Sequence, residues 1–203
     1  NEKLNTGDQI RLFLSDETFS KFSQQEQTAR AVTDLDIIYE DTDILLINKP
    51  AGMLSQPDDT KEPSMVEYLI GYLLQNGSLT EENLRTFHPS VCNRLDKNTS
   101  GVIAAGKSLA GLQELSTLFH DRTVHKDYLC IVKGKLTRSR HIRGYLHKDA
   151  NLNKVSVSPT KEKDAQPIET QYTPICNNEH ATLLKVRLIT GRTHQIRAHL
   201  ASE

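Results

Sequence analysis

One aspartate, Asp96, stands between two cations and is the first candidate for chemistry in this chain. Arg94 and Lys97 flank it, and neighbouring cations stabilise the ionised form of a carboxylate. The turn-forming residues 98–101 (Asn-Thr-Ser-Gly) follow at once, and such loops often carry catalytic groups. The local sequence leaves three interpretations open: a nucleophile, a metal ligand, or a turn residue that bonds its own backbone. Taken alone, it favours the turn residue.

A second polar cluster lies near the end of the chain, in residues 190–200 (Thr-Gly-Arg-Thr-His-Gln-Ile-Arg-Ala-His-Leu). A predicted strand ends at Thr190, and Thr193 is expected to cap a helix. The basic side chains at the start of that helix are Arg192, His194 and Arg197. Cations oppose the positive end of a helix dipole, so the cluster indicates that an anion binds there, either a phosphate or Asp96. A capped helix with solvated basic residues is the alternative, but so dense a polar set after a buried strand favours function.

Two further segments carry weaker signals. Residues 125–128 (His-Lys-Asp-Tyr) open a predicted strand, and Tyr128 could stack on a planar base or take part in proton transfer. Lys49 precedes the rigid Pro-Ala-Gly turn at residues 50–52. A core or rim tyrosine and a solvated lysine are the commoner outcomes for such residues, and the local sequence favours them.

The composition favours a single sizeable domain in a reducing compartment. A chain of 203 residues can bury a substantial core. Its three cysteines, Cys92, Cys130 and Cys176, are far apart, which argues against a disulfide framework and leads us to expect a cytoplasmic protein. No C-x-x-C or H-E-x-x-H motif occurs, so no zinc site is expected. No apolar run has the length of a membrane span, and no signal-peptide pattern opens the chain.

The net charge of −1 conceals a strong asymmetry along the sequence. Residues 1–90 carry 7 Lys/Arg and 16 Asp/Glu, a net charge of −9. Residues 91–203 carry 18 and 10, a net charge of +8. A basic half suits a surface that meets nucleic-acid phosphates. Mixing of unlike charges on the folded surface is the alternative, and the asymmetry alone does not decide between them.

The elements that must position these segments follow an α+β pattern. Apolar periodicity predicts helices over 62–75 and 108–119, the second capped by Ser108. Apolar and alternating runs predict a hairpin over 37–47 and strands over 102–105, 127–132, 141–146, 154–158, 168–174 and 181–189. Because strands dominate the second half without regular βαβ alternation, we expect a mixed, largely antiparallel central sheet flanked by helices.

Four segments in this order resemble the RluA/RluD-type pseudouridine synthases, which isomerise uridines in ribosomal RNA. The segments are 40–52, 94–101, 126–128 and 190–197. The resemblance implies the catalytic fold of that family over residues 36–203, truncated at its C-terminal side because family members continue further. It also implies that residues 1–22 are the remnant of an S4-like RNA-binding domain, joined by a linker over 23–35.

The resemblance also implies roles for single residues. Asp96 matches the family's essential aspartate, Tyr128 the tyrosine that stacks on the target base and is implicated in proton removal, and Arg192 the arginine that pairs with the aspartate. Arg94 would help to hold a uridine flipped out of its helix, because the bond to be broken is otherwise shielded by stacking. Further substrate-binding residues would be Lys49, Lys126, His194, Gln195 and Arg197. The implied reaction detaches uracil from N1 and rejoins it through C5, without cofactor or metal.

One position departs from the family pattern, and two other function classes remain. The family has His before Arg-Leu-Asp, whereas Asn93 stands here; we expect altered loop packing rather than lost activity. A glycosidase would need a second carboxylate about 5–9 Å from Asp96, and none stands out. A non-catalytic RNA-binding module is the other alternative, against which the retention of Asp96, Tyr128 and Arg192 argues. The expected partner is RNA, from the large ribosomal subunit or transfer RNA, with no obligate protein partner.

Overall fold

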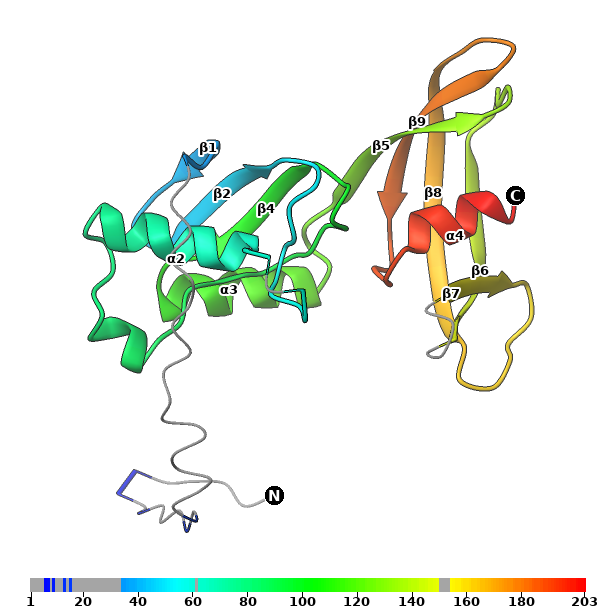
Figure 1. Cartoon of the computed structure of the whole chain (residues 1–203). Coiled ribbons are helices and arrows are strands. Elements are labelled where there is room, and N and C mark those ends of the chain that lie inside the picture. The colour runs from blue at the N-terminus through cyan, green and yellow to red at the C-terminus, as the bar shows by residue number, and fades with distance from the viewer. Residues whose placement is uncertain are drawn as a thin grey trace.

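The computed structural model describes residues 34–60, 62–149 and 154–203, together with Thr6, Gly7, Gln9, Phe13 and Ser15. The predicted S4-like remnant and linker lie almost entirely outside the described residues. The named strands form two antiparallel sheets, each with its own helices, and so make two lobes (Figure 1). The predicted α+β class is confirmed, with the strands divided between two sheets instead of forming one central sheet.

The first lobe contains a four-stranded sheet with the order β1-β2-β4-β3. Its strands are β1 (Ile37–Glu40), β2 (Ile44–Lys49), β3 (Ser90–Val91) and β4 (Gly101–Gly106). The predicted hairpin is confirmed, because β1 and β2 pair antiparallel. The Asp41 carboxylate closes its turn by accepting hydrogen bonds from the Asp43 and Ile44 N–H groups, both at 2.8 Å. This is the self-bonding behaviour that makes aspartate common in turns.

Helix α2 (Met65–Gln75) supplies the main core of the first lobe. Ser64 and Glu67 form a capping box at its start, which satisfies N–H groups that have no partner within the helix. A short 3-10 helix, η1 (Asn83–Arg85), follows α2 in the chain. The fully buried apolar side chains shared by α2, β2 and β4 are Leu45, Ile47, Met65, Leu69 and Ile103.

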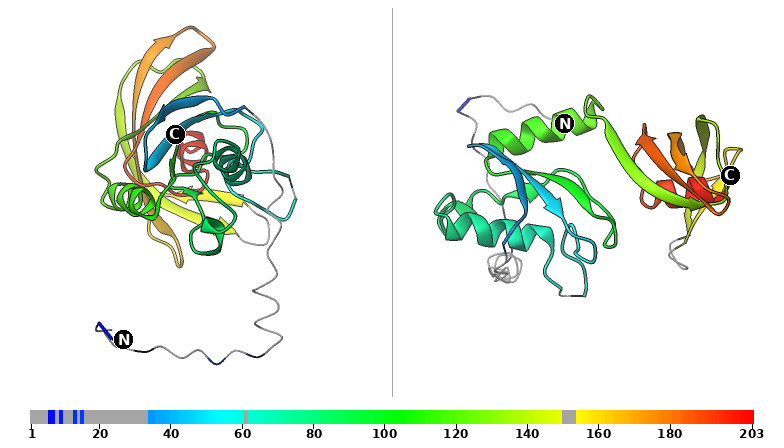
Figure 2. Two further views of the ribbon diagram at one scale, coloured as in Figure 1. Left: turned by 90° about the vertical axis from the view of Figure 1, so that its left-hand side faces the viewer. Right: turned by 90° about the horizontal axis from the view of Figure 1, so that it is seen from above.

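Helix α3 (Leu109–His120) covers the opposite face of the same sheet (Figure 2). Ser108 caps it as predicted, since its side chain accepts from the Gly111 N–H at 3.0 Å. The helix lies close to the sheet: a Cβ added to Gly106 would lie 2.5 Å from the Leu112 Cα, and one at Gly111 would lie 2.1 Å from the Asp43 carbonyl oxygen. Neither glycine therefore has room for a side chain.

The second lobe contains a five-stranded sheet with the order β5-β9-β8-β6-β7. Its strands are β5 (Lys126–Lys133), β6 (Arg140–Asp149), β7 (Lys154–Ser158), β8 (Gln166–Asn177) and β9 (Ala181–Leu188). All five were predicted, with β7 at the predicted bounds. Helix α4 (Gln195–Ala201) packs on this sheet, whose buried core residues are Ile142, Tyr172, Leu184 and Val186 (Figure 1). None of the described helices is long and apolar enough to span a bilayer.

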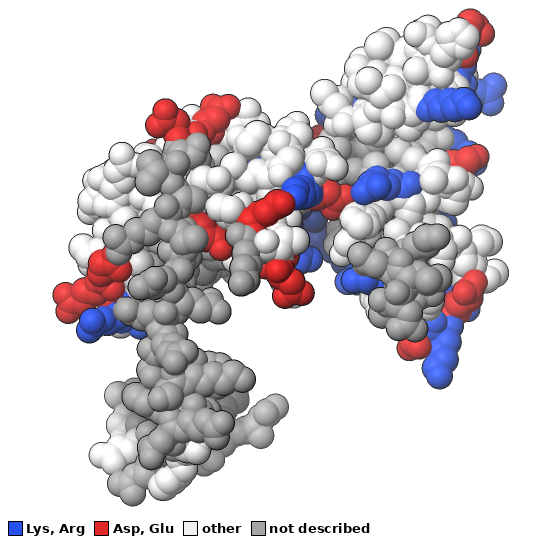
Figure 3. Space-filling view, in the orientation of Figure 1, with Lys and Arg blue, Asp and Glu red and all other residues white. Residues whose placement is uncertain are grey.

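The two lobes differ sharply in charge (Figure 3). Residues 34–125, which form the first lobe, carry 7 Lys/Arg and 14 Asp/Glu. Residues 126–203, which form the second, carry 14 Lys/Arg and 7 Asp/Glu. The asymmetry seen along the sequence is therefore an asymmetry between two bodies, and unlike charges are not evenly mixed over the surface.

Candidate active site between the lobes

Asp96 lies on the loop between β3 and β4, and a buried serine holds the residue before it. The Ser55 hydroxyl donates to the Leu95 carbonyl oxygen at 2.7 Å and accepts from the Leu95 N–H at 3.0 Å. Ser55 is 5% exposed, so water does not compete strongly for either bond. The sequence did not indicate Ser55, because the fold alone brings it close to a residue 40 positions further along the chain.

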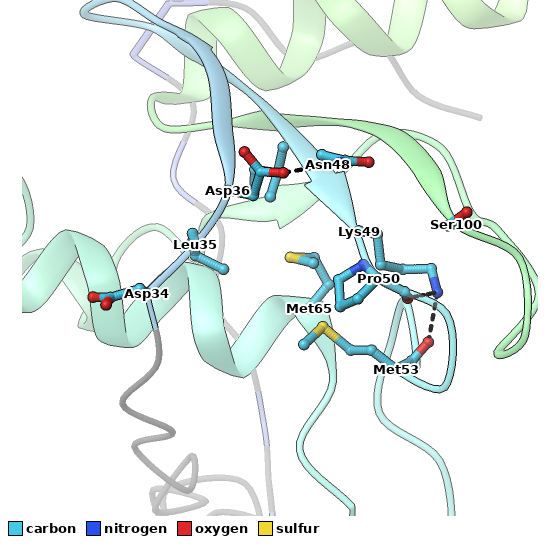
Figure 4. Close-up of a pocket in the computed structure, with 10 residues that line it drawn as sticks. Asp34, Leu35, Asp36, Asn48, Lys49, Pro50, Met53, Met65 and Ser100 are labelled. Carbon is cyan, nitrogen blue, oxygen red and sulfur yellow. Dashed lines mark hydrogen bonds between the residues drawn. The ribbon is translucent and has the colours of Figure 1, made fainter.

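Lys49, at the end of β2, also holds the loop that carries Asp96. Its side chain is fully buried. Its ammonium donates to the carbonyl oxygens of Pro50 at 2.9 Å and Met53 at 2.8 Å (Figure 4), and to that of Lys97 at 3.2 Å. Burial lowers the pKa of Lys49, and the negative charge of Asp96 opposes that shift. All three N–H groups have partners in this structure, where Lys49 holds the loop. That Lys49 binds substrate stays a prediction.

The hollow drawn in Figure 4 lies beside Lys49. It has a volume of about 270 Å³ and lies between the start of β1, the end of β2 and α2. Its polar lining includes Asp36 and Asn48, which already bond each other at 2.8 Å. Asp96 and Tyr128 are not among its lining residues, and we therefore place the candidate site at the lobe junction.

Helix α4 brings two basic side chains to Asp96 from the second lobe. His194 Nε2 lies 3.7 Å and Arg197 Nη1 lies 3.8 Å from Asp96 Oδ2. Both distances exceed the range of a hydrogen bond, so these contacts are electrostatic. The Asp96 side chain is 33% exposed. The carboxylate therefore faces solvent at the junction of the lobes, with an arginine and a histidine side chain opposite it.

Arg192 does not make the pairing predicted for it. Among the described basic side chains, His194 and Arg197 are the ones within 4.0 Å of the Asp96 carboxylate. Arg192 is exposed, and its backbone N–H donates to Gln195 Oε1 at 3.0 Å. The prediction that Thr193 caps the helix is also wrong, because α4 begins at Gln195 after His194, which has a left-handed φ of 55°. Arg192 thus lies in the turn before the helix.

Gln195 is an internal anchor of α4 in this structure, and its contact with substrate stays a prediction. It is 1% exposed. Its Oε1 accepts from the Thr190 hydroxyl at 2.9 Å and from the Arg192 N–H, while its Nε2 donates to the Glu169 carbonyl and the Thr170 hydroxyl, both at 3.0 Å. A buried amide with all its bonding capacity used fixes the local structure strongly. It therefore ties the turn and the helix to β8.

His199 completes this buried anchor from the next turn of α4. Its Nδ1 lies 3.0 Å from the Thr170 hydroxyl, which Gln195 also contacts. Burial lowers the pKa of His199, and Glu203 opposes the shift. Since the Thr170 hydroxyl accepts from Gln195, it has a proton free to donate to a neutral His199. The three side chains form a closed polar network beneath the helix that carries Arg197.

Tyr128 lies on β5, partly buried against the core of the second lobe. Burial first, and then the negative charge of Asp96, raise the pKa of its hydroxyl. Tyr128 therefore stays protonated at neutral pH and lies within electrostatic reach of the carboxylate. A neutral phenol ring at this position offers a surface on which a base can stack.

Two other predicted residues border the same junction. The Lys126 ammonium lies against the turn that carries Arg192, since a Cβ added to Gly191 would lie 2.9 Å from it. Burial and the nearby Arg122 lower the pKa of Lys126. Arg94 is exposed beside Asp96. Within the described part of the chain, no group of three His, Cys, Asp or Glu side chains could hold a metal ion. The junction thus presents one carboxylate, one phenol and several cations.

Comparison with known proteins identifies the family. Residues 43–202 match the RNA pseudouridylate synthase family. The chain belongs to this family. A ribosomal large subunit pseudouridine synthase D from Borreliella burgdorferi is 33% identical over 93% of the chain and 59% of its own length. One from Zymomonas mobilis is 30% identical over 83% of the chain and 52% of its own length. The chain thus spans less than two thirds of these relatives.

The fold agrees with the assignment to the RNA pseudouridylate synthase family. The solved structure of human RNA pseudouridylate synthase domain containing 1 matches with a TM-score of 0.65. It covers 85% of this chain and 66% of the human chain at 20% sequence identity. The family match extends through both lobes and includes Asp96, Tyr128 and Arg197. Membership of the family therefore applies to the whole junction.

Proposed function

We propose that this protein isomerises uridine to pseudouridine in RNA, with large-subunit ribosomal RNA as the substrate. The observation that carries the proposal is the Asp96 carboxylate at the lobe junction of a pseudouridylate synthase-family chain, opposite His194 and Arg197. The names of the bacterial relatives support the choice of ribosomal RNA. Transfer RNA is a further candidate substrate, for which the structure offers no separate support.

The chemistry assigns different tasks to the residues at the junction. The bond between ribose C1′ and uracil N1 breaks, and a bond between C1′ and C5 forms. Asp96, as nucleophile or as the group that stabilises the separated fragments, acts on the ribose or the uracil. One proton leaves C5 and one is gained at N1, so the reaction is an isomerisation. Arg197, the fixed positive charge opposite Asp96, meets the RNA backbone.

Tyr128 is assigned to stacking on the target base. The same environment that raises the pKa of its hydroxyl makes a free phenolate uncommon at neutral pH. We therefore do not expect a Tyr128 phenolate, formed before the substrate binds, to remove the proton from C5. The ring can still hold the flipped uracil, and its hydroxyl can relay a proton to a second acceptor.

The test is release of tritium from RNA labelled at uridine C5. We expect the protein to release tritium from large-subunit ribosomal RNA transcripts, and Asp96→Asn to reduce release to background. The substitution keeps the size of the side chain and removes its charge, so RNA affinity should change little. No release from any ribosomal or transfer RNA by the unaltered protein would overturn the proposed activity. Release by Asp96→Asn at the original rate would remove Asp96 from the mechanism.

A further inference from the structure

Asn93 stands where strand β3 gives way to the loop that carries Asp96. Strand β3 pairs with β4 through Ser90 opposite Gly106 and Val91 opposite Ala105. Continued in the same register, the ladder would set Cys92 opposite Ala104 and Arg94 opposite Val102. The backbone begins to follow this path, since the Cys92 N–H donates to the Ala104 carbonyl at 2.7 Å.

The next two ladder bonds are made by a side chain. Asn93 Oδ1 accepts from the Ala104 N–H at 2.8 Å, and Asn93 Nδ2 donates to the Val102 carbonyl at 3.0 Å. In an unbroken antiparallel ladder these partners would be the Cys92 carbonyl and the Arg94 N–H. A carboxamide offers the same donor and acceptor as a peptide group. The Asn93 carboxamide therefore takes the place of one backbone peptide group of the strand.

We propose that Asn93 is a positioning residue for Asp96, an inference that rests on the proposed function. Its carboxamide bonds the Ala104 N–H and the Val102 carbonyl of β4. The backbone from Arg94 onward can therefore leave the sheet without leaving these two groups unpaired. Leu95 is then held by Ser55, and Asp96 projects toward the second lobe. Without the carboxamide, the Ala104 N–H and the Val102 carbonyl need other partners. An unbroken ladder would supply them from the Cys92 carbonyl and the Arg94 N–H, and pairing with these groups would draw Asp96 toward the sheet.

Two substitutions separate the two bonds of the carboxamide. Asn93→Ala removes both bonds. Asn93→Asp keeps an acceptor for the Ala104 N–H but sets a carboxylate against the Val102 carbonyl oxygen, where a donor is required. Ser108→Ala is the matched control, because it removes the cap of α3 in the same lobe and lowers stability without touching the loop.

The experiment measures single-turnover tritium release, RNA affinity and melting temperature for the protein and these three variants. We expect both Asn93 variants to slow single-turnover release by at least about 10-fold, with RNA affinity changed by less than about 2-fold. Ser108→Ala should lower the melting temperature and keep the rate. Hydrogen exchange of the Ala104 amide should accelerate in Asn93→Ala and stay slow in Asn93→Asp. Rates that fall no further than in Ser108→Ala would overturn the inference.

A crystal structure of Asn93→Ala decides the inference independently of activity. We expect the Asp96 carboxylate to have moved away from His194 and Arg197. An unmoved Asp96 would overturn the positioning role even if the protein proved inactive on every RNA tested. Inactivity of the unaltered protein, by contrast, would count against the proposed function alone.

Discussion

The first lobe holds Asp96 on a loop, whereas the second lobe holds His194 and Arg197 at the start of a helix. The loop has no ladder of its own, so side chains from neighbouring elements bond its backbone directly, notably Lys49 and Ser55. The helix satisfies its own backbone and is fixed instead by buried polar side chains beneath it. The carboxylate is therefore set by its backbone, while the cations have exposed ends that can adjust to a substrate.

The lobes also differ in how they would meet RNA. The second lobe is basic and offers cations to phosphates, whereas the first is acidic and repels them (Figure 3). RNA should therefore lie mainly on the second lobe, with the first lobe supplying the carboxylate at the junction. Substitutions that remove the anchoring side chains of one lobe at a time test whether the two lobes are held independently.

The largest effect is expected from Lys49→Met, which removes the anchor of the first lobe. Three carbonyl oxygens lose their shared donor, two of them in the turn after β2 and one in the Asp96 loop. The Lys97 carbonyl oxygen keeps the Gly52 N–H as a donor at 2.8 Å, so the cost falls on the Pro50 and Met53 carbonyl oxygens. Unsatisfied buried acceptors are costly, and we expect a loss of about 3 kcal/mol in unfolding free energy. Urea unfolding measures the loss. Lys97→Met, at an exposed lysine of the same loop, is the control and should change stability little. A loss equal to the control would show that the carbonyls find other donors.

A smaller loss, confined to the second lobe, is expected from Thr170→Val. The substitution keeps the shape of a fully buried side chain and removes the hydroxyl that Gln195 and His199 share. We expect a loss of about 2 kcal/mol, with faster hydrogen exchange in α4 and unchanged exchange in β2 and β4. Thr173→Val, on the exposed side of the same strand, should have little effect. Equal acceleration in both lobes would contradict their separate anchoring.

The buried histidine makes the stability of the second lobe depend on pH. Burial lowers the pKa of His199 in the folded state, so below the unfolded value of about 6.5 the unfolded chain binds the proton more readily. The contribution is fully present above about pH 6.5 and is lost as the pH falls through the folded pKa, with a slope of up to about 1.4 kcal/mol per pH unit. Urea unfolding at several pH values should show this slope, and His199→Gln should reduce it. Identical slopes would remove His199 from the network.

The smallest effect on stability is expected from Arg197→Gln. The Arg197 side chain is 74% exposed, and its nearest charged nitrogen is 3.8 Å from Asp96; such pairs contribute little, here less than about 0.5 kcal/mol. RNA binding should weaken, and the slope of log affinity against log salt should fall by about 1. Arg85→Gln, at an exposed arginine of the first lobe, should leave both unchanged. An unchanged salt slope in Arg197→Gln would show that this side chain does not meet the RNA.

Local signals in the sequence predicted the elements well. Ser108 caps α3 as expected, and β7 has the predicted bounds. These features depend on residues a few positions apart. The division of the strands into two sheets was not predicted, because pairing between distant strands leaves no local pattern.

The features of the site that the sequence did not indicate involve burial and one helix boundary. Lys49 and Gln195 are polar residues whose partners come partly from distant segments, so nothing beside them in the sequence marked them as buried. Helix α4 begins two residues later than Thr193 because Gln195 binds the turn and His194 adopts a positive φ. Of the three basic residues that the sequence placed near an anion, His194 and Arg197 lie within 4.0 Å of the Asp96 carboxylate in this structure.

Among the described residues, those shown to interact with Asp96 from across the junction all belong to the second lobe. Tyr128, His194 and Arg197 all move with the second lobe, so a small rotation between the lobes alters their three relations to the carboxylate together. The site is therefore assembled or dismantled as one unit. A substrate that bridges the lobes incorrectly would lose its stacking surface and its counter-charges at the same moment, which makes discrimination between RNAs a matter of lobe alignment as well as local fit.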